Sequence, residues 1–141
     1  MTQKNLKDGI ISKLSTLNIK IYDETVKQGF KEPCFFVKFI VNTHEKIKTN
    51  RYIRYNTLEL LYFSDKEDSK QDYDEMAEKL NDLLEYIYIE SEEINIRASG
   101  EITSEVKDDV LHISVDYNYH LVTLDDKKKM KNLEQGVDIN E

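Results

Sequence analysis

The chain of 141 residues is poor in the features that mark secreted and membrane-spanning proteins. Its single cysteine, Cys34, cannot form an internal disulfide, which favours a reducing compartment. No uncharged apolar run is longer than Cys34–Val37, which ends at Lys38, and residues 1–17 contain no apolar core of a signal peptide. We therefore expect neither secretion nor a segment that spans a membrane.

Glycine is scarce and poorly placed for binding phosphate. The four glycines, at positions 9, 29, 100 and 136, are too scattered for a phosphate-binding loop, and neither of the two common nucleotide-binding spacings occurs. The segment His44–Lys48 begins like the zinc motif His-Glu-x-x-His, but Lys48 occupies the second ligand position and would repel the metal. The sequence thus predicts no nucleotide cofactor and no zinc site of this type.

The remaining histidines do not combine into a catalytic or metal site. His112 and His120 share one face of a predicted strand, but eight extended residues separate them by about 26 Å. Asp116 lies midway, about 13 Å from each, which is too far for a shared metal ion or a proton relay. We predict no catalytic, cofactor-binding or metal-binding residues and interpret these side chains as polar groups on a solvated face.

Charge is unevenly distributed along the chain. The net charge of −8 opposes non-specific adhesion to nucleic acid or to anionic membranes. Residues 65–93 hold twelve acidic and three basic side chains, whereas residues 1–58 hold eleven basic and five acidic ones. The molecule is therefore electrically polar if these two regions lie apart in the fold.

One short basic stretch mixes cations with aromatic rings. A solvated loop explains this composition, a surface for single-stranded nucleic acid is a second interpretation, and contact with the acidic region of a neighbouring copy is a third. A repeated head-to-tail contact of the third kind would close a ring or grow a filament. The stretch consists of Lys46, Lys48, Arg51, Tyr52, Arg54 and Tyr55.

Nine Tyr and five Phe indicate a folded chain, and the N-terminal half predicts a helix followed by strands. Apolar residues recur at helical spacing from Asn5 to Leu17, with Thr2 as a candidate cap. A short strand is expected over residues 19–22. Residues 34–41 and 52–63 read as strands of a hairpin, with the polar residues 42–51 as an exposed connection.

The C-terminal half predicts a second helix and further strands. Asp72 and Glu75 resemble a capping box, and the buried face of the following helix would hold Met76, Leu80, Leu83, Leu84 and Ile87. A weaker strand is expected over residues 94–103, and Lys107, Asp108 and Asp109 suit a turn. Residues 110–122 alternate apolar and polar side chains, as a strand with one buried and one wet face does.

This order of elements predicts an α+β fold in which two helices pack on one face of a mainly antiparallel sheet. The other face of the sheet is then partly available to a partner. We expect residues 1–124 to form a single domain. The stretch from residue 125 to residue 141 is poor in large apolar groups, so we expect a mobile C-terminal tail there.

Four segments of the sequence resemble one known family. They are Ile21–Phe39 (IYDETVKQGFKEPCFFVKF), Asn50–Phe63 (NRYIRYNTLELLYF), Ala77–Ile87 and Val110–Tyr119. In this order they resemble a phage tail terminator family of tailed phages and prophages from Gram-positive bacteria. One departure is the turn before the last segment, where the family commonly has Asp-Gly and this chain has Asp108-Asp109.

The resemblance implies a non-enzymatic structural protein of the virion tail, assembled in the host cytoplasm. Members form a ring, here expected to contain six copies, on the head-proximal end of the tail tube, where the ring stops polymerisation and offers a surface for head joining. The implied partners are further copies of the chain, the tail tube protein and a head-completion or connector protein. Neither a membrane nor a specific nucleic-acid sequence is among them.

Two other functions stay open at this point. One is a head-tail connector that contacts the portal side and the DNA that passes through. The other is a small enzyme that uses Cys34 with a distant histidine. For the terminator, the candidate interface residues are Lys46, Lys48, Arg51, Arg54, His112, Asp116 and His120.

Overall fold

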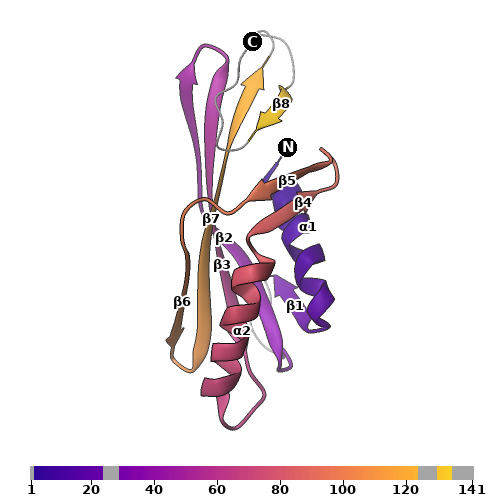
Figure 1. The fold of residues 1–141 in the computed structure, drawn as a ribbon, viewed down its shortest axis with the longest axis vertical. Coiled ribbons are helices and arrows are strands. Elements are labelled where there is room, and N and C mark those ends of the chain that lie inside the picture. The colour runs from indigo at the N-terminus through magenta and orange to yellow at the C-terminus, as the bar shows by residue number, and fades with distance from the viewer. Residues whose placement is uncertain (1, 24–28, 124–129, 135–141) are drawn as a thin grey trace.

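The computed structural model of the protein describes residues 2–23, 29–123 and 130–134 (Figure 1). Two helices and one short 3-10 turn accompany eight strands in the described part of the chain. The helical elements are α1 (Gln3–Leu14), η1 (Ser15–Leu17) and α2 (Ser69–Leu83). The strands are β1 (Lys20–Asp23), β2 (Cys34–Lys48), β3 (Arg51–Phe63), β4 (Tyr86–Ile89), β5 (Ile94–Arg97), β6 (Ile102–Lys107), β7 (Val110–Thr123) and β8 (Met130–Glu134).

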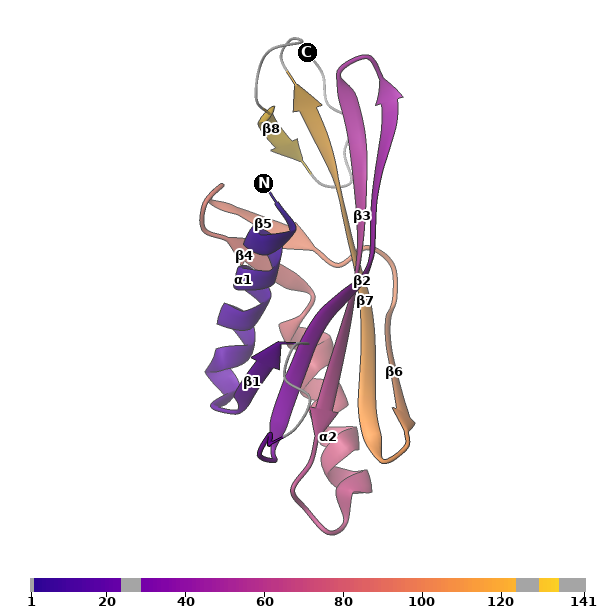
Figure 2. The same cartoon turned by 180° about the vertical axis from the view of Figure 1, so that it is seen from behind.

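The main sheet has the strand order β1-β2-β3-β7-β6, and β8 pairs with the far end of β7. All of its pairings are antiparallel except that of β1 with β2. Strands β4 and β5 form a separate hairpin that lies with α1 and α2 on one side of the main sheet (Figures 1 and 2). The predicted α+β fold, with both helices on one face, is confirmed.

The core lies between this face and the helices. The strands contribute alternate residues, which on β7 are every second one from Leu111 to Leu121, as the sequence predicted. Helix α1 begins at the predicted cap, where the Thr2 side chain accepts a hydrogen bond from the Asn5 amide. Gly9 permits its close packing on β4, because a Cβ atom there would lie 2.7 Å from the Tyr88 carbonyl oxygen.

The largest correction concerns the first hairpin. Residues 42–51 were predicted to form a connection, but β2 continues to Lys48 and β3 begins at Arg51, so that only Thr49 and Asn50 lie in the turn. The pairing Asn42 with Asn56 continues to Lys48 with Arg51. Exposed side chains from residue 42 to residue 49 remove the apolar alternation by which a strand is recognised.

Three further boundaries differ from the prediction. Helix α2 begins at Ser69 after Asp68, so Asp72 is not its cap. Ile87 is buried as expected, but it belongs to β4. The single strand expected over residues 94–103 is divided between β5 and β6, which belong to different sheets and flank Gly100 at φ 85°.

The turn between β6 and β7 is tight even though it lacks the expected glycine. Lys107 pairs with Val110, and the two residues between them, Asp108 and Asp109, have φ angles of 54° and 63°. Two-residue hairpin turns with positive φ at both positions match the twist of the strands, and aspartate tolerates this conformation better than most residues. Asp108-Asp109 in place of the expected Asp-Gly is therefore compatible with a tight hairpin turn.

Within the stretch predicted as a tail, Met130–Glu134 form β8, which pairs with β7 from His120 to Thr123. The other residues of that stretch lie outside the described part, and the domain boundary at residue 124 stays a prediction. Neither α1 nor α2 is long and apolar enough to cross a membrane, as far as the described residues go.

Candidate assembly interface

The first hairpin extends well beyond the layer of helices (Figures 1 and 2). Strand β1 covers the outer edge of β2 only from Cys34 to Val37. Among the described residues, no strand pairs with that edge from Lys38 onward. In the far half of the hairpin the outer edge of β2 is therefore open, while β3 stays paired with β7 as far as Arg51, and this half carries the basic stretch found in the sequence.

Strand register divides the seven predicted interface residues between two faces of the sheet. Lys48 pairs with Arg51, and Arg51 pairs with Val122, which places both on the face away from the helices. His112, Asp116 and His120 alternate with buried residues of β7 and share that open face. The two others, Lys46 and Arg54, pair with Tyr52 and Tyr119 and thus belong to the helix-side face.

Side chains of the hairpin are held by contacts across its two strands. The Arg54 Nε atom donates a hydrogen bond to Nδ1 of His44 at 3.0 Å, and the His44 ring stacks on Tyr52 with ring centroids 4.6 Å apart. On the opposite face the Tyr55 hydroxyl donates to Glu45 Oε1 at 2.7 Å, which raises the pKa of Tyr55. These contacts order the hairpin without covering its edge.

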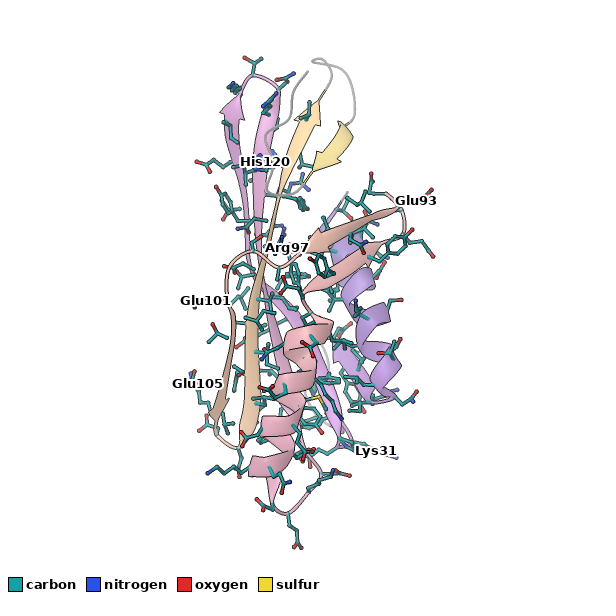
Figure 3. All side chains as sticks on the ribbon, in the orientation of Figure 1. Lys31, Glu93, Arg97, Glu101, Glu105 and His120 are labelled. Carbon is teal, nitrogen blue, oxygen red and sulfur yellow. The ribbon has the colours of Figure 1, made fainter. Side chains whose placement is uncertain are left out.

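The open face carries a row of polar groups that cross from strand to strand. Glu59 on β3 lies 3.3 Å from Lys38 Nζ on one side and 3.4 Å from His112 Nδ1 on the other. Further along, the Thr57 hydroxyl donates to Asp116 Oδ1 at 2.7 Å. His120 lies near the end of β7 that accompanies the hairpin (Figure 3). The structure therefore places His112, Asp116 and His120 on one accessible face but at separate points along it.

One end of the open face is aromatic, a feature that strand alternation alone did not predict. The Tyr22 and Phe36 rings stack at 5.3 Å, and Phe30 packs against Phe36 and Phe63 at 5.1 and 5.0 Å. All four side chains are half-buried. The open face thus combines an apolar end with a polar middle, a composition common at protein–protein interfaces.

The structure argues against Cys34 as a nucleophile. Its side chain is fully buried, and burial together with the nearby Glu32 carboxylate raises the pKa of the thiol to about 11. A thiol of this kind stays protonated at neutral pH, which is the opposite of an activated cysteine. Within the described residues, no three His, Cys, Asp or Glu side chains are close enough together to hold a metal ion.

Two features relevant to an interface are not predicted by the sequence. One is the free edge of β2, because its residues read as a loop. The other is the exposure of Ile40, Ile47 and Val106, which lie on strands at the two edges of the sheet. Their apolar character among charged neighbours was the available signal, but only the topology shows that they lie at edges.

The chain was compared with models of known protein families and with curated proteins. Residues 5–130 match the model of a family described as "Phage tail terminator protein". No curated protein matches the chain.

Proposed function

The chain belongs to the phage tail terminator family, and from this we propose that it caps the head-proximal end of the tail tube, ends tube polymerisation and provides the surface on which the head is joined. The observation that carries the proposal is the family match, which spans nearly all of the described residues. The family is structural, and the shape of the chain supports a role in adhesion. A long exposed hairpin and one open sheet face are available for contacts.

Termination needs only differential binding. One surface must bind the last ring of the tube, and the opposite surface must be unable to recruit another tube subunit. We propose that the chain does this as a ring of six copies, in the virion tail of a phage or prophage of Gram-positive bacteria, after assembly in the host cytoplasm. The proposed contact residues are Lys46, Lys48, Arg51, Arg54, His112, Asp116 and His120.

The proposed partners are other copies of the chain, the tail tube protein and a head-completion or connector protein. The proposal includes no membrane and no specific nucleic-acid sequence. The net charge of −8 supports this choice, since a polyanion binds poorly to DNA or to anionic lipid.

Sedimentation and native mass spectrometry of the purified chain, with and without tube protein, test this proposal. We expect a closed ring, either alone or on the ends of added tubes, and we expect tubes with bound ring to stop lengthening. A strict monomer that never binds tube ends would contradict the proposal. Salt-sensitive binding to DNA without binding to tubes would instead favour a head-tail connector.

A further inference from the structure

Two long stretches of open strand edge lie on opposite sides of the main sheet in the described part of the chain. On one side, β2 has no partner strand from Lys38 to Lys48, and on the other side β6 pairs with β7 alone, within the described part of the chain. An exposed strand edge presents unpaired N–H and C=O groups and acts as a template for another strand. The two edges are thus candidate docking surfaces.

Exposed apolar side chains mark both edges. Ile40 is 53% exposed and Ile47 is 46% exposed on β2, and Val106 is 50% exposed on β6. Large aliphatic side chains with this exposure at an open edge are a liability for a monomer, but they suit a surface that a partner covers.

The two edges also match in length. Register shifts between Phe39 and Val41 and between Lys46 and Lys48 interrupt β2. Between these irregularities the pairing is regular from Val41 to Lys46, which is six residues. Strand β6, Ile102–Lys107, has six residues as well.

Charge favours β6 over β8 as the strand that pairs with the open edge of β2. Residues 42–54, at the end of the hairpin, carry four basic side chains and one acidic, a balance of +3. Residues 101–109, which comprise β6 and its flanks, carry four acidic side chains and one basic, a balance of −3. Glu101 and Glu105 lie along β6 at the side of the molecule (Figure 3). Strand β8, by contrast, has one Lys and one Glu.

Strand direction allows the two edges of neighbouring copies to meet. Because β2, β3, β7 and β6 are antiparallel in turn, β2 and β6 run in opposite directions. A second copy placed beside the first in the same orientation therefore brings its β6 antiparallel to β2 of the first. This contact joins two different surfaces of the chain, and contacts of that kind form rings when the rotation between copies closes.

We infer that, in the ring, the free edge of β2 at Val41–Lys46 pairs antiparallel with β6 of the next copy, so that one sheet continues from subunit to subunit. The inference rests on the proposed ring. Strand β6 is level with the first part of β2, since Ile102 pairs with Val115, Val115 with Leu58 and Leu58 with Phe39. Neighbouring copies are then shifted by about seven residues, roughly 23 Å, which inclines the strands to the ring axis as in β-barrels.

When residues 41–46 pair in full with residues 102–107 of the next copy, running antiparallel, His44 lies opposite Ser104. His44 pairs with Arg54, and Ser104 pairs with the buried Ile113, so both belong to the helix-side face of their strands. Both residues are exposed in the single chain, so their replacement leaves the core intact. Directly opposed residues in antiparallel strands have Cα atoms about 4.5–5.5 Å apart, which is within reach of a disulfide.

Disulfide formation between two variants of the full chain tests the inference. His44→Cys and Ser104→Cys are mixed under assembly conditions and oxidised, and we expect a covalent dimer that contains one of each. A chain that carries both substitutions should give a series of covalent oligomers, the largest of which contains as many copies as the ring. Thr103→Cys is the matched control, because it is the adjacent exposed residue but belongs to the opposite face of β6.

Amide hydrogen exchange is a second measurement, which does not depend on disulfide geometry. We expect residues 41–46 and 102–107 to gain protection when the monomer enters the ring. Rings that form without the mixed dimer and without this protection would overturn the inference and leave the terminator proposal intact. His44→Cys cross-linking with itself would also overturn it, because that outcome requires two β2 edges to meet. Absence of any ring or tube binding would count against both proposals.

Discussion

Changing Lys46, Lys48 and Arg51 together to Glu is expected to weaken ring assembly by at least about 100-fold. The substitutions convert the end of the hairpin from a balance of +3 to −3, the same sign as Glu101 and Glu105, the two acidic residues that lie beside it in the proposed ring. Like charges held together at an interface cost several kcal/mol, and each 1.4 kcal/mol is a tenfold change in affinity. Sedimentation of the variant across a concentration series gives the affinity.

The fold of this variant should remain intact, because exposed charges contribute little to stability. A variant with Lys4, Lys70 and Lys79 changed to Glu is the control, since these three residues are also exposed and the net charge changes equally. We expect the control to assemble as the unmodified chain does. Equal assembly by both variants would remove the hairpin from the interface, and thermal unfolding checks that each variant is folded.

Replacing Asp72 is expected to destabilise the monomer strongly. The Asp72 Oδ2 atom accepts hydrogen bonds from the Tyr62 hydroxyl at 2.9 Å and from the Ser64 hydroxyl at 2.6 Å. In Asp72→Ala both hydroxyls lose their acceptor, and that of Tyr62 belongs to a residue only 3% exposed. An unsatisfied buried hydroxyl costs about 1–3 kcal/mol, so we expect a loss of about 2–3 kcal/mol in the free energy of unfolding, measured with urea.

The same carboxylate should give stability a dependence on acid pH. Burial alone would raise the pKa of Asp72, but the hydrogen bonds from Ser64 and Tyr62 and the charge of Lys66 outweigh burial and lower it. The folded state therefore favours the charged form. This contribution is complete above the pKa of the unfolded chain, near 4, and is lost as the pH falls through the lower pKa of the folded chain.

Urea unfolding as a function of pH checks this dependence. The variant Asp72→Asn should lose part of the acid-induced decline, whereas Asp74→Asn, an exposed change on the same helix, should retain it. Parallel pH profiles for the unmodified chain and Asp72→Asn would show that another group is responsible.

The sequence predicts those parts of the fold that have one buried and one wet face. Strand β7 is the clearest case, because Leu111 to Leu121 face the core while His112 to His120 face the open side. The far half of β2 lacks this contrast, since its side chains are exposed and pairing with β3 alone makes it a strand. A strand can be recognised in the sequence only where burial of one face makes apolar and polar residues alternate.

The role of Asp72 also could not be predicted from its neighbours in the sequence. Its spacing to Glu75 matches a capping box, but its partners Tyr62 and Ser64 lie before the helix, on β3 and just after it. A tertiary contact thus uses the carboxylate that a local rule assigned to the helix end. The candidate interface shows the same limit, because the basic residues are evident in the sequence while their distribution over two faces depends on strand register.

Electron microscopy of phage particles that lack this protein tests the central claim most directly. A terminator acts by capping a growing tube, so its loss should give tubes of uncontrolled length that carry no heads. Restoring the protein should return one uniform tail length. Tails of normal length in its absence would contradict the account.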